Sequence, residues 1–204
     1  MARGNIFVVT APSGAGKTTL VAALLAADQN VQLSISFTTR APRTGEVDGQ
    51  DYHFVERAEF ERMIAANELL EYAEVYGNYY GTSKTWIASV LDNGRDILLE
   101  IDWQGAQQVK RLFPDAVGIF VLPPAIEALE ARLRNRGKDS EAVIAERMAA
   151  AREEMSHYGE ADFIIVNEHI DEAVRDIVSV VRAMRLRLPT QRIRHGALLD
   201  ALKA

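Results

Sequence analysis

Residues 11–18 form a segment whose residue types and spacing are suited to binding phosphate. They match the pattern GxxxxGK[ST] except at the first position, where Ala11 replaces glycine. Glycines in such a turn allow backbone N–H groups to point at phosphate oxygens, and the helix that follows adds the positive end of its dipole. Lys17 would reach the β- and γ-phosphates of a nucleoside triphosphate. The predicted triphosphate site comprises Ala11, Pro12, Ser13, Gly14, Ala15, Gly16, Lys17 and Thr18.

Two carboxylates mark the end of the apolar run at residues 97–101, because Glu100 lies within it and Asp102 directly follows it. A carboxylate at the carboxyl end of a buried strand, beside a phosphate loop, is suited to orient Mg²⁺ or its water ligands. The alternative is that Asp102 caps the next helix, and one side chain can do both. We therefore predict a Mg²⁺ site at the hydroxyl of Thr18 and at Asp102, directly or through water.

Arg40 and Arg43 flank Pro42 in a turn that can direct both side chains at one point. Guanidinium groups suit a doubly charged phosphate monoester, because each can donate two N–H hydrogen bonds to it. Tyr52 and Tyr80 are available as hydroxyl donors to the same oxygens. The alternative is that both arginines are solvated on the surface. The segment leads to the hypothesis of a second phosphate site.

Glu71 is a candidate for recognising the base of that second nucleotide. Guanine presents two neighbouring donors, N1–H and its amino group, and one carboxylate can accept both, whereas adenine lacks this pair. The hydroxyls of Ser36 and Thr82 are available for the O6 edge. Taken alone, Glu71 is one acid among 29, and an exposed strand residue is the more common role of such a side chain.

The elements that must position these residues begin with four apolar runs of strand length, at residues 6–9, 97–101, 117–122 and 163–166. Each run is apolar on both faces, which is typical of a parallel sheet covered by helices on both sides. Segments with helical spacing lie between the runs, and the alternation predicts an α/β sandwich. The phosphate-binding segment falls between the first run and the first helical pattern, which disfavours an accidental match in a glycine-containing turn.

Two regions depart from this alternation. Residues 32–37 alternate polar and apolar side chains, and residues 71–80 are rich in tyrosine, so we expect a small mixed insertion at about residues 37–88. Residues 126–158 are helical in pattern and rich in arginine. A solvated helix and tail is expected to carry the five arginines of the C-terminal segment, which are Arg182, Arg185, Arg187, Arg192 and Arg194.

The composition of the 204-residue chain is typical of one globular domain, with 48% hydrophobic and 25% charged residues. The absence of cysteine excludes disulfides and thiolate metal sites. A formal net charge of −6 gives no reason to expect binding to nucleic acid or to an anionic membrane. No stretch is apolar for long enough to span a membrane, and the N-terminus lacks the pattern of a signal peptide. We expect a cytoplasmic protein whose partners are small molecules, with a homo-oligomer left open.

Six blocks of the sequence together resemble the guanylate kinase family in its bacterial form. They are residues 11–18, 36–43, 45–49, 77–82, 101–105 and 136–137. The blocks TTRAPR at 38–43 and GNYYG at 77–81 are specific to that family rather than to phosphate loops in general, and the likeness runs from about residue 4 to residue 188. Two positions depart from the family pattern. Ala11 stands where the pattern has glycine, and Glu100 stands where we expect aspartate.

The resemblance implies a three-layer P-loop nucleoside monophosphate kinase fold in one domain, residues 1–204. Its parts would be a core with a parallel sheet, an inserted mixed β region that binds GMP, and a helical lid. The expected core covers about residues 4–36, 89–125 and 159–204, the insertion about 37–88 and the lid about 126–158. The implied reaction moves the γ-phosphoryl group of ATP to GMP with the help of Mg²⁺, and we expect dGMP as a further acceptor.

The resemblance also implies roles for individual side chains. GMP would be held by Ser36, Arg40, Arg43, Tyr52, Glu71, Tyr80, Thr82 and Glu100. Three contacts of the Glu100 side chain stay as alternatives: guanine, a Mg²⁺-bound water and Lys17. The expected catalytic cations are Lys17, Arg132, Arg136 and Arg147.

No histidine is expected to act as a base, because the phosphate of GMP has its second pKa near 6 and is mostly deprotonated at neutral pH. We interpret His53, His157, His169 and His195 as structural or solvated. Three alternatives stand beside this reaction. A phosphate-loop kinase for another nucleotide or metabolite is disfavoured by the paired arginines with Glu71. A noncatalytic guanylate-kinase-like protein-binding module is disfavoured by the intact Lys17 and Thr18. A switch that hydrolyses a nucleoside triphosphate without an acceptor is disfavoured because it would not need the insertion.

Overall fold

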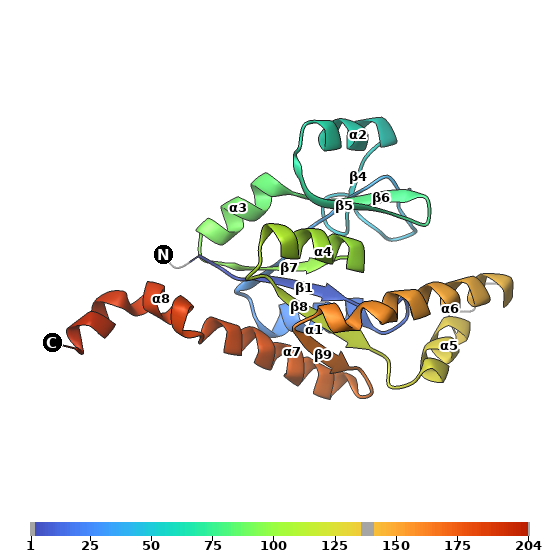
Figure 1. Cartoon of the computed structure of the whole chain (residues 1–204). Coiled ribbons are helices and arrows are strands. Elements are labelled where there is room, and N and C mark those ends of the chain that lie inside the picture. The colour runs from blue at the N-terminus through green and yellow to red at the C-terminus, as the bar shows by residue number, and fades with distance from the viewer. Residues whose placement is uncertain (1–2, 136–140, 204) are drawn as a thin grey trace.

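The computed structural model describes residues 3–135 and 141–203. Its central feature is a five-stranded parallel sheet with the strand order β2-β7-β1-β8-β9 (Figure 1). The strands are β1 (Ile6–Thr10), β2 (Val31–Leu33), β7 (Asp96–Glu100), β8 (Val117–Leu122) and β9 (Phe163–Val166). The four apolar runs of the sequence coincide with β1, β7, β8 and β9, which confirms the predicted parallel sheet.

The side chains of β1 alternate between two hydrophobic clusters, one on each face of the sheet. Phe7 and Val9 belong to the cluster with α1 and α7, whereas Ile6 and Val8 belong to the cluster with α3 and α4. These four helices are α1 (Lys17–Ala27), α3 (Lys84–Asp92), α4 (Trp103–Leu112) and α7 (Ile170–Arg185). The result is a three-layer α/β sandwich in which the carboxyl ends of β1, β7 and β9 meet near the start of α1.

A second, mixed sheet with the strand order β4-β3-β6-β5 lies beside the core sheet, together with α2 (Figure 1). Its elements are β3 (Phe37–Thr38), β4 (His53–Phe54), α2 (Arg57–Ala65), β5 (Leu69–Val75) and β6 (Asn78–Ser83). The alternating residues 32–37 are therefore divided, since Gln32 lies in the core strand β2 and Phe37 begins β3. The expected boundary at residue 88 falls inside α3, which packs on the core sheet.

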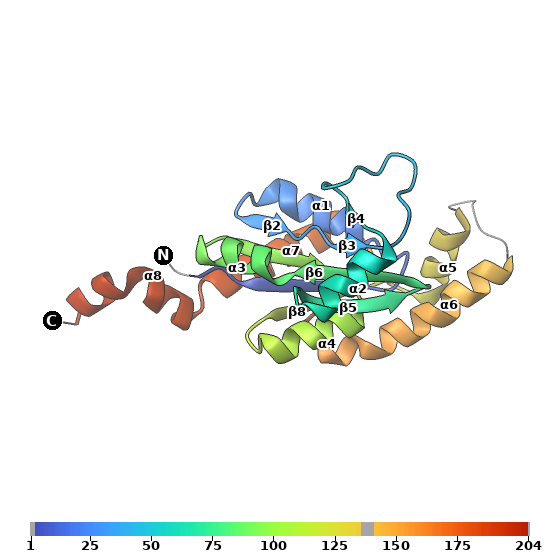
Figure 2. The same ribbon diagram turned by 90° about the horizontal axis from the view of Figure 1, so that it is seen from above.

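Two helices extend from the core beyond the start of α1, on the side away from the C-terminus (Figure 2). They are α5 (Ile126–Asn135) and α6 (Glu141–Ser156), and the 3₁₀ helix η1 (His157–Glu160) follows α6 directly. The pair has a hydrophobic cluster of its own, which includes Leu129, Leu133, Ile144 and Met148. This cluster makes α5 and α6 one packed unit at the edge of the core. Arg136, expected among the catalytic cations, lies outside the described residues.

The last helix, α8 (Leu188–Ala201), projects away from the sandwich (Figures 1 and 2). Four of the five C-terminal arginines are exposed as predicted, but the prediction was wrong for Arg185. Its guanidinium is largely buried and forms ion pairs with Asp28 and Asp96, because α7 carries it back to the amino end of β7. Within the described residues, no helix is long and apolar enough to cross a membrane.

Candidate active site

The phosphate loop connects β1 to α1 and depends on two glycines in the left-handed region. Gly14 has φ of 97° and Gly16 has φ of 93°. A Cβ atom at Gly16 would lie 2.4 Å from Nδ2 of Asn167, so a side chain is excluded there on two grounds. Ala11 is not among the described non-glycine residues with positive φ. Alanine therefore replaces the first glycine of the pattern without backbone strain.

The back of the loop is held by residues from distant parts of the chain. Asn167, which directly follows β9, donates from Nδ2 to the carbonyl oxygen of Ala15 at 2.8 Å. Arg132 of α5 donates to the same oxygen at 3.3 Å and to the carbonyl oxygen of Asn167 at 3.1 Å. The sequence prediction missed Asn167. Its position directly after the apolar run at residues 163–166 is visible in the sequence, but its contact with the loop depends on strand order. In this structure Arg132 supports the loop from behind.

Lys17 and Thr18 begin α1 and face the carboxyl end of β7. Nζ of Lys17 donates to the carbonyl oxygen of Ile101 at 3.3 Å, and Oγ1 of Thr18 donates to Oε1 of Glu100 at 2.7 Å. Asp102 caps α4, since its Oδ1 accepts from the backbone N–H of Gly105 at 2.9 Å. Of the two predicted carboxylates, Glu100 is thus the one hydrogen-bonded to Thr18, and Asp102 has the capping role that was its alternative.

Arg40 is held in place by Glu46 and by aromatic rings. Its two terminal nitrogens donate to the two carboxylate oxygens of Glu46 at 3.0 and 2.9 Å, and its guanidinium lies 5.3 Å from the centre of the Tyr52 ring. Glu46 also accepts from the backbone N–H of Arg43 at 2.7 Å. The hydrogen bonds from Arg40 hold the pKa of Glu46 below its usual range. Glu46 therefore orders the segment that carries both arginines.

Glu71 is a buried carboxylate with an unused hydrogen-bonding position. Its side chain lies on β5, the residue is 3% exposed, and Oε1 has no hydrogen-bond partner. Burial raises the pKa of Glu71 to about 7, an effect opposed by the hydroxyl of Thr82 and reinforced by the charge of Asp102. A buried acceptor without a partner is rare in proteins and calls for a ligand or water that supplies the missing donor.

The surroundings of Glu71 complete a polar pocket. Oγ of Ser36 and Oγ1 of Thr82 lie 3.5 Å apart, and both residues are buried. A Cβ atom at Gly105 would come within 2.6 Å of Oε2 of Glu71, so the glycine of α4 leaves the space that the carboxylate occupies. The ring centroids of Tyr52 and Tyr80 lie 5.9 Å apart in an edge-on arrangement. Burial is the main cause that raises the pKa of the Tyr52 hydroxyl.

These residues line two adjoining cavities that share Lys17, Tyr52, Val75, Tyr80 and Asp102. The larger, of about 360 Å³, contains the phosphate loop together with Arg40 and Arg43. The smaller, of about 140 Å³, contains Ser36, Glu71 and Glu100. The structure thus brings nearly all of the predicted site residues together. Among the expected lid cations, Arg132 lies behind the loop and Arg147 lies half-buried on α6.

Glu154 of α6 is a cleft residue that the sequence prediction missed. Its Oε2 accepts from the backbone N–H of Ser13 at 3.1 Å, and it lines the same cavity as the phosphate loop. Burial is the main cause that raises its pKa, while the Ser13 N–H and the charge of Lys17 lower it. No local pattern distinguishes Glu154 from the other acids of α6, such as Glu146 and Glu153.

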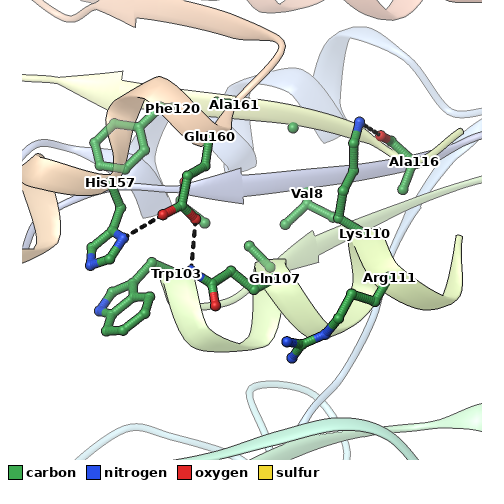
Figure 3. A pocket seen from close by; sticks show the side chains of 13 residues that line it. Val8, Trp103, Gln107, Lys110, Arg111, Ala116, Phe120, His157, Glu160 and Ala161 are labelled. Carbon is green, nitrogen blue, oxygen red and sulfur yellow. Dashed lines mark hydrogen bonds and ion pairs between the residues drawn. The ribbon is translucent and has the colours of Figure 1, made fainter. Parts of the chain in front are cut away.

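A further cavity, of about 300 Å³, lies between α4 and η1 (Figure 3). It is lined by Trp103 and His157, whose rings stack with centroids 3.7 Å apart. Figure 3 shows Glu160 joining η1 to α4, because it accepts from Gln107 of α4 at 2.9 Å, and within η1 it also pairs with His157 at 2.7 Å. These contacts attach the end of α6 to α4 and confirm the structural interpretation of His157.

Comparisons with known proteins agree on one family. The family model described as guanylate kinase matches residues 3–184. A guanylate kinase of Dechloromonas aromatica is 59% identical over 199 residues, which is 98% of each chain, and one of Vibrio vulnificus is 50% identical over the full length of both chains. The crystal structure of guanylate kinase from Anaplasma phagocytophilum superposes with a TM-score of 0.78 at 37% identity, covering 92% of this chain and 89% of that one.

Proposed function

The chain belongs to the guanylate kinase family, and we propose a role for each part of its cleft in the transfer of the γ-phosphoryl group from ATP to GMP. In this assignment ATP places its phosphates on the loop at residues 11–18, and GMP occupies the cavity that contains Glu71. The observation that carries the assignment is the buried carboxylate of Glu71, with one oxygen unpartnered, in a cavity that adjoins the phosphate loop.

Guanine recognition is assigned to Glu71, Ser36 and Thr82. The unpartnered Oε1 and its neighbour Oε2 would accept from N1–H and the amino group of guanine. The two hydroxyls would serve the O6 edge, since Ser36 lines the cavity with Glu71 and Thr82, paired with Glu71 between β5 and β6, lies 3.5 Å from the Ser36 hydroxyl. Adenine would leave the buried carboxylate without its donors, and an unsatisfied buried charge is strongly unfavourable. The pocket therefore selects for guanine by the penalty it imposes on adenine.

The phosphate of GMP is assigned to Arg40, Arg43, Tyr52 and Tyr80, all of which line the larger cavity. Glu46 accepts two hydrogen bonds from the guanidinium of Arg40. Nη1 of Arg40 also donates to the carbonyl oxygen of Ala41 at 2.8 Å, so Nε–H and the second N–H of Nη2 are the donors that would serve a phosphate, and Arg43 adds a second cation. Glu46 then acts as a support that keeps Arg40 in one orientation before GMP arrives.

The residues around Thr18 fit Mg²⁺ bound together with the ATP phosphates. Among the described residues, no group of three or more His, Cys, Asp or Glu side chains is arranged to hold a metal ion alone, and Mg²⁺ in kinases is held by few protein ligands plus phosphate oxygens and water. Thr18 would bind the ion directly, Asp102 through water, and Glu100 would orient the Thr18 hydroxyl. When bound, Mg²⁺ supplies positive charge to the β- and γ-phosphates.

The chemical step needs no general base, because the acceptor oxygen of GMP is mostly deprotonated at neutral pH. The protein must hold two anions in line and neutralise charge as the phosphoryl group passes between them. Lys17 is the cation placed for this, since it lines both cavities. Arg147 and Arg136 would add charge when α5 and α6 close over the cleft, which would also exclude water as a competing acceptor. Arg132, expected among the same cations, would instead act through the loop that it supports from behind.

The finer properties of the enzyme are proposed on the same basis. We propose dGMP as a further acceptor, because the contacts assigned here recognise base and phosphate and none of them requires the 2′-hydroxyl. We place the reaction in the cytoplasm, where ATP and GMP are available. A homo-oligomer stays a prediction, which size-exclusion chromatography with light scattering tests.

The acceptor specificity distinguishes this function from a phosphate-loop kinase for another nucleotide. ADP production from Mg-ATP should be measured in a coupled assay with GMP, dGMP, AMP, CMP and UMP as acceptors. GMP and dGMP should stimulate it, and the other three should not. Stimulation by AMP as strong as by GMP would contradict the guanine assignment, and no stimulation by any acceptor would favour a noncatalytic module.

A further inference from the structure

The contact between Glu154 and the phosphate loop places a negative charge where the donor nucleotide must place its own. Oε2 of Glu154 accepts a hydrogen bond from the N–H of Ser13, and Ser13 belongs to the loop whose N–H groups are directed at phosphate oxygens. The carboxylate lines the same cavity as Gly14, Gly16 and Lys17. Because carboxylate and phosphate oxygens are both anionic acceptors, Glu154 resembles a phosphate in this position.

The electrostatic surroundings of Glu154 support this comparison. Lys17, the residue assigned to the ATP phosphates, is the cation whose charge acts on Glu154, whereas Asp102 and Glu153 repel it. The side chain is half-buried, so its charge is screened less than that of a surface acid. ATP would bring several negative charges into the same cavity, and these would repel the carboxylate.

Glu154 also lies at the attached end of α6. His157 comes three residues later and stacks on Trp103 of α4, so this end of the helix is fixed to the core (Figure 3). Arg147 precedes Glu154 by seven residues, which is two helical turns, and therefore lies on the same face of α6. A small displacement near the fixed end of a long helix becomes a larger one at the far end.

From these observations we propose that Glu154 occupies part of the donor-phosphate position in the ligand-free enzyme and is displaced when ATP binds. The displacement couples ATP binding to a movement of α6, the helix that carries Arg147. This inference rests on the proposed function, because it requires ATP to use the loop at residues 11–18. It assigns Glu154 a role as a competing anion that lowers the affinity for the donor.

The variant Glu154→Gln tests the proposal, because its amide oxygen can still accept from Ser13 while the charge is gone. Binding of adenosine, ADP and ATP should be measured by calorimetry without GMP. Removing one like charge from a partly screened cleft is expected to tighten ATP binding about tenfold. ADP should gain less than ATP, and adenosine should not gain, because the effect depends on phosphate charge. In steady state, KM for ATP should fall while kcat does not rise.

Glu153→Gln is the matched control, since it makes the same charge change at the neighbouring, exposed position. Its ATP affinity should stay within about twofold of wild type, because exposed charges are screened. Glu154→Ala is a second test variant, which also lacks the charge and should also bind ATP more tightly than wild type. ATP binding by Glu154→Gln that is unchanged or weaker, or an equal gain for adenosine, would overturn the proposal. Failure of the wild type to bind ATP would instead contradict the proposed function itself.

Discussion

The substitution Glu71→Gln separates recognition from stability, because the same buried charge is expected to serve one and to oppose the other. Gln keeps the size of the side chain and removes its charge. It also replaces one acceptor oxygen by an NH₂ group, which would face a donor of guanine. The consequences for GMP and for the folded state can be worked out separately.

The loss of guanine recognition follows from the two hydrogen bonds assigned to the carboxylate. A hydrogen bond to a charged group contributes about 1.5–3 kcal/mol. Losing one of them, with a donor now facing a donor, should lower kcat/KM for GMP by about 3 kcal/mol, or about 100-fold. AMP does not use the pair, so its kcat/KM should not fall. The ratio between GMP and AMP should therefore decrease by about 100-fold.

The effect on stability has the opposite sign. The pKa of Glu71 is about 7 in the folded protein, against an ordinary value of 4.5. Between these values the folded protein holds a proton that the unfolded chain has lost, so the free energy of unfolding decreases as pH rises from about 4.5 to about 7. Above pH 7 the ionised, buried Glu71 destabilises the fold by about 3 kcal/mol. Glu71→Gln lacks this effect and should be the more stable protein at pH 8.

Two measurements test this reasoning. Urea denaturation should show Glu71→Gln more stable than wild type by about 2–3 kcal/mol at pH 8, with the difference vanishing near pH 4.5. Binding of guanosine, which carries no phosphate to titrate, should weaken in the wild type as pH falls below 7 and should stay constant in the variant. Equal stability of the two proteins at pH 8, or unchanged discrimination between GMP and AMP, would refute the assignment of Glu71.

Substitutions of other cations test the remaining assignments of the cleft and the core. Lys17→Ala should lower kcat by about 10²- to 10³-fold, because it removes the cation nearest the transferred group, with an unchanged circular dichroism spectrum. Arg40→Ala or Arg43→Ala should raise KM for GMP by about tenfold or more while KM for ATP stays nearly constant; an equal rise for both nucleotides in steady-state kinetics would count against the phosphate assignment. Arg185→Met should lower the free energy of unfolding by about 3 kcal/mol, because it leaves two carboxylates without their cation, whereas the exposed Arg187→Met should change it little in the same urea titration.

The core of the fold was predictable because its signals are local. Each central strand is apolar on both faces, and the phosphate loop has fixed spacing between a strand and a helix. Even the tolerance of Ala11 depends only on its own backbone angle, which the structure shows to be free of strain. The blocks around Arg40 and Tyr80 allowed a site for the acceptor nucleotide to be predicted, since their residue types suit a second phosphate.

The burial of Glu71 was not predictable, because it depends on packing between elements distant in sequence. The pattern of β5 is typical of an exposed acid, but α4 covers this strand and Gly105 leaves room for the carboxylate. Asn167, Glu154 and Arg185 depend in the same way on partners more than a hundred residues away. Such contacts follow from strand order and helix placement, which no local pattern encodes.

Transfer of a labelled phosphoryl group would show whether the cleft brings two anionic nucleotides together and excludes water. ATP labelled at the γ-phosphate should be incubated with the enzyme, Mg²⁺ and GMP, and the products separated by chromatography. The label should appear in GDP, and little should be released as inorganic phosphate. Label released as inorganic phosphate at the same rate with and without GMP would contradict this prediction.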